Sequence, residues 1–305
     1  MRIVVTGAGG FVGRELCRQL LMRGDEVVGL DVHAAGMPDG MRQVVGELSD
    51  PAVRRDMMRE TFDALVHLAT VPGGAAESDP AASWRVNVDA MYDLLLECAA
   101  KAPGIRVVYA SSIAVLGDTL PSVVDDQTPL APKMIYAGHK AMMEQAVAMF
   151  SNRGMIDGVT VRLPGILARP KGPSGMKSAF MSDLFHALKN GEPFECPVFA
   201  DGTIWAQSVK TCAGNLRTAI YLDSARLPAT RAVTLPALRI AMGDLAAEIA
   251  SQCGVSPELV TYKPDLQLDA VFARQPVLVT SAAEHAGFVH DGNPASLVAN
   301  ALASL

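Results

Sequence analysis

A glycine-rich segment near the start of the chain restricts the possible fold more than any other feature of the sequence. Residues 6–13 read Thr-Gly-Ala-Gly-Gly-Phe-Val-Gly, between a short β-branched run and a stretch of apolar residues at helical spacing. Gly7 allows a tight turn, Gly10 lets the backbone approach a pyrophosphate, and Gly13 lets the helix pack closely on the strand. Phosphate charge is also attracted to the N-terminus of such a helix. The segment therefore predicts a dinucleotide-binding strand-turn-helix unit.

Strands and helices alternate over the first half of the chain. The expected strands cover residues 2–6, 26–31, 42–45, 64–68, 105–110 and 159–163. The expected helices cover residues 11–23, the segment after the Asp50-Pro51 cap, about 80–100, and 136–150. Apolar strands separated by helices are typical of a parallel sheet that is covered on both faces. We therefore expect an α/β fold built on a doubly wound Rossmann sheet.

The alternation becomes less regular after Pro164. Residues 169–175 are too rich in proline and glycine for regular structure. We expect residues 1–165 to form the nucleotide-binding Rossmann domain, with a return to it near 208–225. Residues 166–305 are expected to form mainly a smaller α+β substrate-binding lobe.

Charge and composition narrow the class of partner. The net charge is −6 and no run of Lys or Arg occurs, so the sequence lacks the electrostatic pattern of a nucleic-acid or membrane-surface binder. It also lacks a signal-peptide pattern and any apolar stretch approaching the ~20 residues that span a bilayer. The five cysteines and six histidines are scattered, which predicts reduced core cysteines and no metal site. We expect a cytoplasmic protein with a small-molecule substrate and no nucleic-acid or membrane partner.

Asp31 ends the second expected strand. A carboxylate at this position accepts the ribose hydroxyls of adenosine and repels a ribose phosphate. Because no nearby arginine offers a phosphate clamp, NAD is favoured over NADP as the cofactor. The alternative is that Asp31 only caps the following turn, as aspartate often does.

Tyr136 and Lys140 stand four residues apart at the start of an expected helix and so share one face. A phenol with an ordinary pKa of about 10 acts as a base near neutrality only where positive charge stabilises the phenolate. Lys140, together with the nicotinamide ring of a bound cofactor, supplies that charge. Ser111 and Ser112 end another expected strand, at the carboxyl edge where such sheets bind ligands. The alternative for the Tyr/Lys pair is a half-exposed helix face.

Taken in order, these segments resemble the extended short-chain dehydrogenase/reductase family, also described as the NAD-dependent epimerase/dehydratase superfamily. The resemblance covers residues 1–170. It rests on the glycine pattern, Asp31, His67-Leu68-Ala69, Asn87, the Ser-Ser-x-x-Val-x-Gly segment at 111–117, Asp126-Gln127-Thr128-Pro129, and Tyr136 and Lys140 with Glu144 beyond them.

The resemblance implies a catalytic set of Ser112, Tyr136 as general acid/base, and Lys140, which also holds the nicotinamide ribose. Ser111 is the weaker candidate for the serine, and Asn87 is either near the site or an ordinary polar residue of a helix start. The implied cofactor contacts are Gly7, Gly10, Phe11, Val12, Gly13, Asp31, Leu68, Ala69, Asn87, Ser111, Tyr136, Lys140 and Pro164. One departure is Gly46-Glu47-Leu48, where the family usually has an aspartate for the adenine amino group. Glu47 or a backbone group would replace it.

Three classes of activity fit this pattern: a dehydrogenase, a nucleotide-sugar epimerase that keeps NAD tightly bound, and a non-catalytic sensor of NAD(P). The complete Ser/Tyr/Lys set argues against the sensor. Ile113 and Ala114 stand where dehydratases of the family carry an acid pair, and no dense Arg/Lys set is present to hold a nucleotide diphosphate. A dehydrogenase is therefore favoured.

The second half of the chain resembles the sugar-acid branch of the family, particularly the D-erythronate dehydrogenases. The resemblance rests on Val161-Arg162-Leu163-Pro164, residues 169–175, Ser178-Ala179-Phe180, and Thr234-Leu235-Pro236-Ala237-Leu238. It implies NAD-dependent oxidation of a secondary hydroxyl of a small aldonate or uronate, by a homodimer. The expected substrate-binding residues are Thr70, Ser112, Arg169, Lys171 and Ser174. Arg169, Lys171 and Ser174 are natural partners for a carboxylate, although each is as easily a solvated loop residue.

Overall fold

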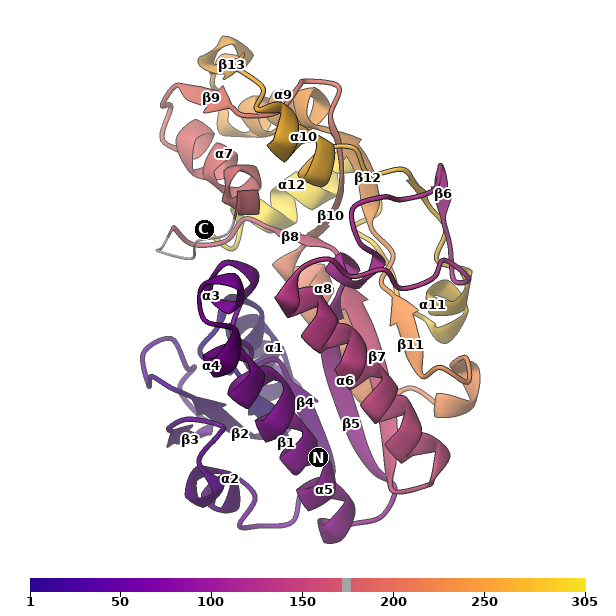
Figure 1. Cartoon of the computed structure of the whole chain (residues 1–305). Helices are drawn as coiled ribbons and strands as arrows, with labels where there is room; N and C mark the ends of the chain where they lie inside the picture. Colours follow the sequence, from indigo (N-terminus) through magenta and orange to yellow (C-terminus); the bar gives the residue numbers. More distant parts are fainter. Residues whose placement is uncertain (172–176) are drawn as a thin grey trace.

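The computed structural model describes residues 1–171 and 177–305 (Figure 1). The strands are β1 (Arg2–Thr6), β2 (Glu26–Asp31), β3 (Arg42–Val45), β4 (Ala64–His67), β5 (Ile105–Ser112), β6 (Val123–Val124), β7 (Ile156–Leu163), β8 (Gly165–Leu167), β9 (Phe194–Cys196), β10 (Thr203–Ser208), β11 (Ala232–Thr234), β12 (Leu238–Ala241), β13 (Val260–Tyr262) and β14 (Val277–Leu278).

The α-helices are α1 (Phe11–Met22), α2 (Pro51–Met57), α3 (Gly73–Ser78), α4 (Pro80–Trp84), α5 (Ala90–Lys101), α6 (Ile135–Asn152), α7 (Phe180–Lys189), α8 (Val209–Tyr221), α9 (Met242–Cys253), α10 (Leu266–Phe272), α11 (Ser281–Ala286) and α12 (Pro294–Leu302). One π-helix, η1 (Arg85–Asp89), and short 3-10 turns at η2 (Ile113–Leu116), η3 (Lys177–Ala179), η4 (Ser224–Arg226) and η5 (Pro257–Leu259) complete the described elements. No helix of the described ranges is long and apolar enough to cross a membrane.

The large sheet has seven parallel strands in the order β11-β7-β5-β4-β1-β2-β3. Each of the six strands expected from the sequence is present in it, although β7 begins at Ile156 and not at Val159. The order reverses between β1 and β4, which is where doubly wound sheets bind ligands at the carboxyl ends of their strands. The predicted Rossmann fold is confirmed.

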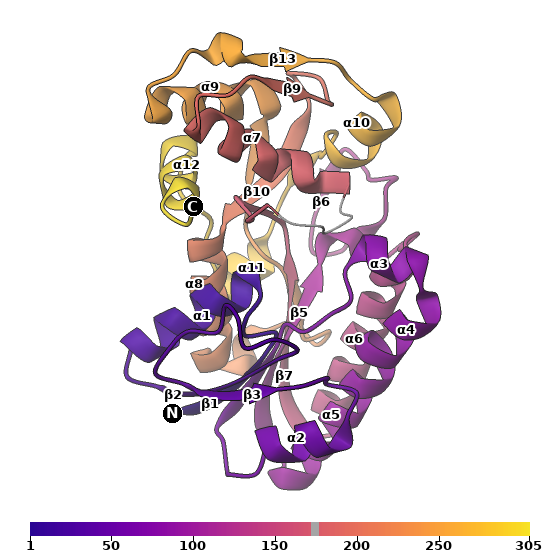
Figure 2. The same ribbon diagram turned by 90° about the vertical axis from the view of Figure 1, so that its left-hand side faces the viewer.

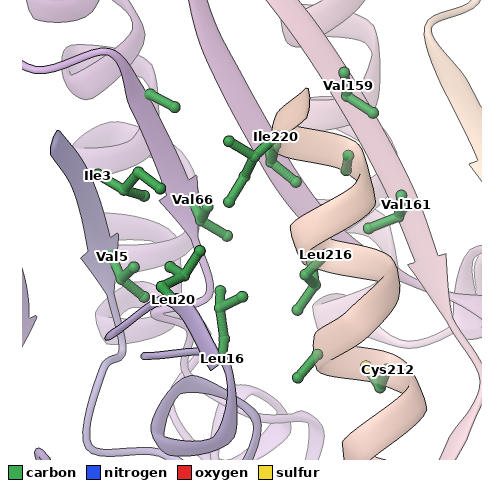
Figure 3. Packing of buried hydrophobic residues seen from close by; sticks show 14 of the residues in the cluster. Ile3, Val5, Leu16, Leu20, Val66, Val159, Val161, Cys212, Leu216 and Ile220 are labelled. Carbon is green, nitrogen blue, oxygen red and sulfur yellow. The ribbon is translucent and has the colours of Figure 1, made fainter. Parts of the chain in front are cut away.

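Helices cover both faces of this sheet (Figures 1 and 2). On one face, α1 and α8 bury their apolar sides against β1, β4 and β7; Figure 3 shows Leu16 and Leu20 of α1 beside Leu216 and Ile220 of α8. On the other face, α2, α5 and α6 contribute to a second cluster. Full burial of one such leucine or isoleucine stabilises the fold by roughly 1.5–3 kcal/mol. These two clusters hold the strand ends in fixed positions.

The helix expected over about 80–100 is present from Pro80 to Lys101, but it is not a regular α-helix throughout. The π-helix η1 separates α4 from α5, and the separate helix α3 precedes them. The local sequence is helical throughout, so apolar spacing alone does not reveal the wider turn. Asn87, inside η1, bonds to the backbone of Val71 in the loop after β4, and this tertiary contact accompanies the altered winding.

The C-terminal part has its own hydrophobic cluster. It is formed by α7, α9 and α12 together with the small sheet β12-β10-β8. The chain returns to the large sheet three times after residue 165: α8 packs against α1, β11 pairs with β7, and α11 adds Ala283 and Ala286 to the same hydrophobic cluster as α1 and α8. β11 lies outside both ranges expected for the nucleotide-binding domain. We propose that this domain comprises residues 1–164, α8, β11 and α11, with the remainder as the substrate lobe.

Candidate active site

The glycine turn after β1 has the shape that a dinucleotide requires. Gly7 has a φ of 73°, and a Cβ atom there would lie 2.8 Å from the backbone nitrogen of Ala69. A Cβ atom on Gly13 would lie 2.0 Å from the carbonyl oxygen of Gly7. Helix α1 has no side-chain cap at Gly10 and no acidic residue in its first turn. Its first backbone N–H groups, including those of the expected contacts Phe11 and Val12, therefore suit a pyrophosphate.

Asp31 lies against this turn from the end of β2. Its Oδ2 atom accepts a hydrogen bond from the Gly9 backbone nitrogen at 2.9 Å, and its Oδ1 atom accepts one from the His33 nitrogen at 3.4 Å. The carboxylate thus lies at the glycine turn, as expected for a residue that binds the adenosine ribose. It also contacts the segment after β2, as expected for a residue that caps a turn. Glu47, the expected substitute for the adenine contact, is exposed and accepts a hydrogen bond from Ser49 Oγ at 3.2 Å.

The two serines at the end of β5 have different partners. The Ser112 hydroxyl lowers the pKa of Tyr136 through a side-chain hydrogen bond, and it accepts the Ala114 backbone N–H at 3.2 Å. The Ser111 hydroxyl is buried and donates to Glu144 Oε1. Because a carboxylate only accepts, the Ser111 proton is directed away from Tyr136. The geometry favours Ser112 as the serine that works with Tyr136.

Tyr136 lies at the start of α6, half-buried. Burial raises the pKa of its phenol above the ordinary value, while the Arg169 charge and the Ser112 hydrogen bond lower it. The sequence pointed to Lys140 as the source of stabilising charge. Among the groups that lower the Tyr136 pKa, the structure has Arg169 instead, which follows β8 in the other half of the chain.

Lys140 is buried one helical turn after Tyr136. Its Nζ donates to the Ala110 carbonyl oxygen at 2.7 Å and lies 4.8 Å from the centroid of the Tyr109 ring. The Tyr136 ring centroid is 5.7 Å away from the same nitrogen. Burial lowers the pKa of Lys140 to about 7, against an opposing effect of Glu144. The hydrogen bond to Ala110 of β5 therefore holds the Lys140 amino group close to the rings of both Tyr109 and Tyr136.

A buried ion pair between Arg162 and Glu144 lies next to Ser111. Arg162 on β7 donates to both carboxylate oxygens of Glu144, with its Nη2 atom at 2.7 Å from Oε2. Charge-assisted bonds of this bidentate type fix both side chains in orientation. They also hold the acceptor for Ser111. The sequence named Glu144 and Arg162 only as parts of resembling segments, because nothing local indicates that β7 and α6 face each other here.

His67 at the end of β4 positions the neighbouring loop. Its Nδ1 atom lies 2.8 Å from Thr6 Oγ1, which also accepts the Ala69 backbone N–H at 3.3 Å. Burial lowers the pKa of His67 to about 3, so the ring is neutral at neutral pH. The Leu68-Ala69 backbone is thereby tied to the glycine strand, beside the turn where both residues were expected to contact the cofactor.

The expected substrate residues are not equally placed. Arg169 is half-buried; its backbone N–H donates to Ser182 Oγ at 3.0 Å, and its carbonyl oxygen accepts from His186 Nε2 at 2.6 Å. Burial lowers the pKa of Arg169, whereas Tyr136 and Cys212 raise it. Lys171 is exposed. Ser174 lies outside the described residues. Arg169 is thus the expected cation that the structure brings to Tyr136.

Thr70, Asn87 and Pro164 lie at strand ends or in contact with them. Thr70 follows β4, and its hydroxyl donates to Asn87 Oδ1 at 3.0 Å. Asn87 is buried and bonds to both backbone groups of Val71, so it positions the loop and is more than a polar helix-start residue. Pro164 is buried between β7 and β8. Sequence reasoning missed Ser182 and His186, which only the fold brings to Arg169.

Comparison with known proteins agrees with this architecture. Residues 3–207 match the family model described as the NAD dependent epimerase/dehydratase family. A D-erythronate dehydrogenase of Cupriavidus necator is 34% identical over 290 residues, which is 90% of this chain and 90% of that protein. A D-erythronate dehydrogenase of Haemophilus influenzae is 29% identical over 302 residues, 96% of each chain.

Two solved structures have closely similar folds. One is a nucleoside-diphosphate-sugar epimerase from Agrobacterium tumefaciens, with a TM-score of 0.88 and 26% identity over 98% of this chain and 92% of that one. The other is an L-threonine dehydrogenase from Cupriavidus necator, with a TM-score of 0.88, 23% identity and 99% coverage of both chains.

Proposed function

Because the chain belongs to the NAD-dependent epimerase/dehydratase family and is an NAD-dependent dehydrogenase of the extended short-chain type, we propose that it oxidises a secondary hydroxyl of a small sugar acid. The observation that carries the proposal is Arg169, a half-buried cation whose charge reaches the phenol of Tyr136. The names of the two curated relatives support an aldonate such as D-erythronate as substrate.

In the proposed mechanism, Tyr136 is the base. The substrate hydroxyl gives its proton to the phenolate oxygen of Tyr136. At the same time the carbon that bears this hydroxyl loses a hydride, and its bond to oxygen becomes double. Bound NAD supplies the acceptor for the hydride. The Ser112 hydroxyl holds the substrate oxygen next to Tyr136. The Arg169 charge stabilises the phenolate, and Lys140, with its Nζ 5.7 Å from the centre of the Tyr136 ring, adds to this effect when it is protonated. The proton passes from Tyr136 to solvent after the ketone forms.

Arg169 is proposed to bind the substrate carboxylate. A guanidinium offers two parallel N–H donors to a carboxylate, and a charge-assisted bond is about twice as strong as a neutral one. Lys171 is exposed and so contributes less, because solvent weakens its charge interactions. Because the Arg169 charge acts on the Tyr136 phenol, we propose that the oxidised hydroxyl and the carboxylate belong to the same short carbon chain. Short aldonates and uronates therefore fit better than neutral sugars.

The experiment that tests the proposal is a substrate panel read by the absorbance of NADH. It contains erythronate and other four- to six-carbon aldonates, uronates, the matching neutral polyols and sugars, and nucleotide sugars. We expect kcat/KM for at least one short acid to exceed that of its neutral counterpart by roughly 10-fold to 150-fold. Equal turnover of neutral sugars would overturn the sugar-acid proposal and leave the dehydrogenase assignment intact.

A second candidate function is a nucleotide-sugar epimerase with tightly bound NAD. The similarity to the epimerase of A. tumefaciens supports it. In this case a nucleotide sugar would be converted without net formation of NADH, and NAD would copurify with the protein. The same panel, with products analysed by chromatography, distinguishes the two activities.

We propose that the protein is a homodimer. Tyr92 and Leu96 on α5 and Met142 and Met149 on α6 are large, apolar and exposed. Their spacings of four and seven residues put each pair on one face of its helix, and the two helices pack side by side. A second copy would cover this surface. Light scattering at micromolar concentration measures the mass, and a Leu96→Lys variant should shift it to that of the monomer.

We also propose that the protein acts in the cytoplasm. All five cysteines are free, and four of them are buried. Free cysteines are typical of reducing compartments. Fractionation of cells that produce the protein tests this location.

A further inference from the structure

The loop after β4 carries a hydroxyl whose polarity is set by its neighbours. Thr70 stands at the carboxyl edge of the large sheet, where β4 lies between β1, which carries the glycine turn, and β5, which ends at Ser112. It is half-buried. Its neighbours decide whether the Thr70 hydroxyl can donate a hydrogen bond to a ligand, accept one, or do both.

The orientation of Asn87 is fixed by backbone groups. The Val71 backbone N–H donates to Asn87 Oδ1 at 2.7 Å, and Asn87 Nδ2 donates to the Val71 carbonyl oxygen at 3.0 Å. A backbone N–H only donates and a carbonyl oxygen only accepts, so a flipped amide would lose both bonds. Asn87 is also only 4% exposed. The oxygen of its amide therefore faces Thr70.

The Thr70 proton is committed within the protein. Asn87 Oδ1 lies 3.0 Å from Thr70 Oγ1, and because that atom only accepts, Thr70 is the donor. The other neighbour of this hydroxyl is the Val71 carbonyl oxygen at 3.5 Å, which is also an acceptor. A threonine hydroxyl has a single proton. What Thr70 can still offer to a ligand is its oxygen lone pairs alone.

Further buried groups hold Asn87 in this orientation. Its Nδ2 atom also donates to Ser83 Oγ at 3.2 Å, and Ser83 Oγ lies 3.1 Å from His139 Nδ1. Burial lowers the pKa of His139, which favours the neutral ring. Ser83 and His139 are both buried. Hydrogen bonds therefore connect Asn87 through Ser83 to α6, and a flipped Asn87 amide would break its two bonds to Val71.

We propose that Thr70 is a specificity-determining residue that accepts a hydrogen bond from a hydroxyl of the substrate. Asn87 acts through it as a positioning residue. The substrate would be held at two points, Thr70 and Arg169, and only the role of Arg169 rests on the proposed function. The Arg169 guanidinium can only donate hydrogen bonds. A donor-only group and an acceptor-only group on opposite parts of a small substrate admit one orientation, with the carboxylate at Arg169 and a hydroxyl at Thr70. A carboxylate or phosphate oxygen at Thr70 would have no proton to give.

The test compares three proteins, the parent, Thr70→Val and Thr70→Ser, with Thr61→Val as control. Thr61 is an exposed threonine before the opposite end of β4. The substrate is whichever compound in the panel reduces NAD most efficiently, acid or neutral. Its analogues replace each hydroxyl other than the oxidised one, singly, by hydrogen and by fluorine. Fluorine resembles the hydroxyl oxygen in size but cannot donate.

For one hydroxyl position of the substrate, we expect kcat/KM of the parent to be about 3-fold to 12-fold lower with the hydrogen analogue than with the unmodified substrate, which corresponds to the loss of a neutral hydrogen bond. The fluorine analogue of the same position should show a loss at least as large. Thr70→Val should show the same loss with the unmodified substrate and no further loss with either analogue. Thr70→Ser should keep the parent pattern. The dissociation constant of NAD, measured without substrate, should be equal in all four proteins.

Three results would overturn the proposal. In the first, Thr70→Val has the same kcat/KM as the parent on the unmodified substrate. In the second, the fluorine analogue has the same kcat/KM as the hydroxyl compound at every position. In the third, the loss in Thr70→Val is matched by weaker binding of NAD, which would assign the contact to the cofactor ribose. A neutral polyol as best substrate would refute the sugar-acid function but leave this test of Thr70 unchanged.

Discussion

The cofactor side and the substrate side of the site are built in different ways. On the cofactor side, consecutive residues form a glycine turn and an uncapped helix start, so the main chain makes the binding surface. On the proposed substrate side, the functional groups are side chains of distant elements: Thr70 after β4, Tyr136 on α6 and Arg169 after β8. A backbone surface tolerates most substitutions except a new Cβ, whereas a side-chain surface changes its chemistry with one substitution.

The two sides should separate most clearly in Tyr136→Phe. This variant removes the proton acceptor without touching the glycine turn, so kcat should fall by roughly 100-fold to 10,000-fold. The dissociation constant of NAD should stay within about 3-fold of the parent value, a difference below 1 kcal/mol. Stopped-flow kinetics and NAD titration measure the two quantities, and Tyr262→Phe, at an exposed position, is the control. Turnover near the parent level would remove Tyr136 from the chemistry.

Arg169→Met tests the substrate side alone. Losing a charge-assisted pair should lower kcat/KM for acid substrates by roughly 10-fold to 150-fold and leave the much lower rate on neutral sugars nearly unchanged. The matched control is Lys171→Met, which removes an equal charge from an exposed position two residues away. If the lysine variant shows the larger, acid-specific loss, the carboxylate is held by the loop and not beside Tyr136.

Asp31→Ala tests the cofactor side where it does depend on a side chain. The parent should prefer NAD over NADP, because the carboxylate at the turn repels a ribose phosphate. The variant should bind NAD about 10-fold more weakly, as expected for lost hydrogen bonds to a charged group, and should reject NADP less. Initial rates with both cofactors give the ratio. Equal use of NAD and NADP by the parent would be inconsistent with this role.

The smallest expected effect is a displacement of the pH profile. In the proposed mechanism oxidation requires the Tyr136 phenolate, so the rate should rise as the pH rises through the pKa of the phenol. The Arg169 charge lowers that pKa. In Arg169→Met the pKa of the free enzyme should therefore be higher, and the rising limb of log kcat/KM should move to higher pH. Lys171→Met should leave the limb in place. A limb that does not move in Arg169→Met would show that the guanidinium acts on the substrate only.

Much of the cofactor side could be predicted from the sequence because its signals are local. The glycines at 7, 10 and 13 and the carboxylate at Asp31 stand next to the strands that present them. Six strands of the large sheet were identified from short, largely apolar segments of four to six residues. The π-turn at η1 was not predicted, since wide and ordinary helical turns share nearly the same apolar spacing over so few residues.

By itself, the sequence determined the parallel sheet, the glycine turn and the identity of the chemical groups, because strand period, turn sterics and side-chain chemistry are properties of neighbouring residues. The tertiary structure supplied the physical reason for preferring Ser112 to Ser111, and only the tertiary structure distinguished Arg169 from Lys171. It also set the polarity of Thr70 through Asn87. These distinctions depend on which groups α6, β7 and η1 bring within hydrogen-bonding distance, and such contacts arise from packing between segments far apart in the chain.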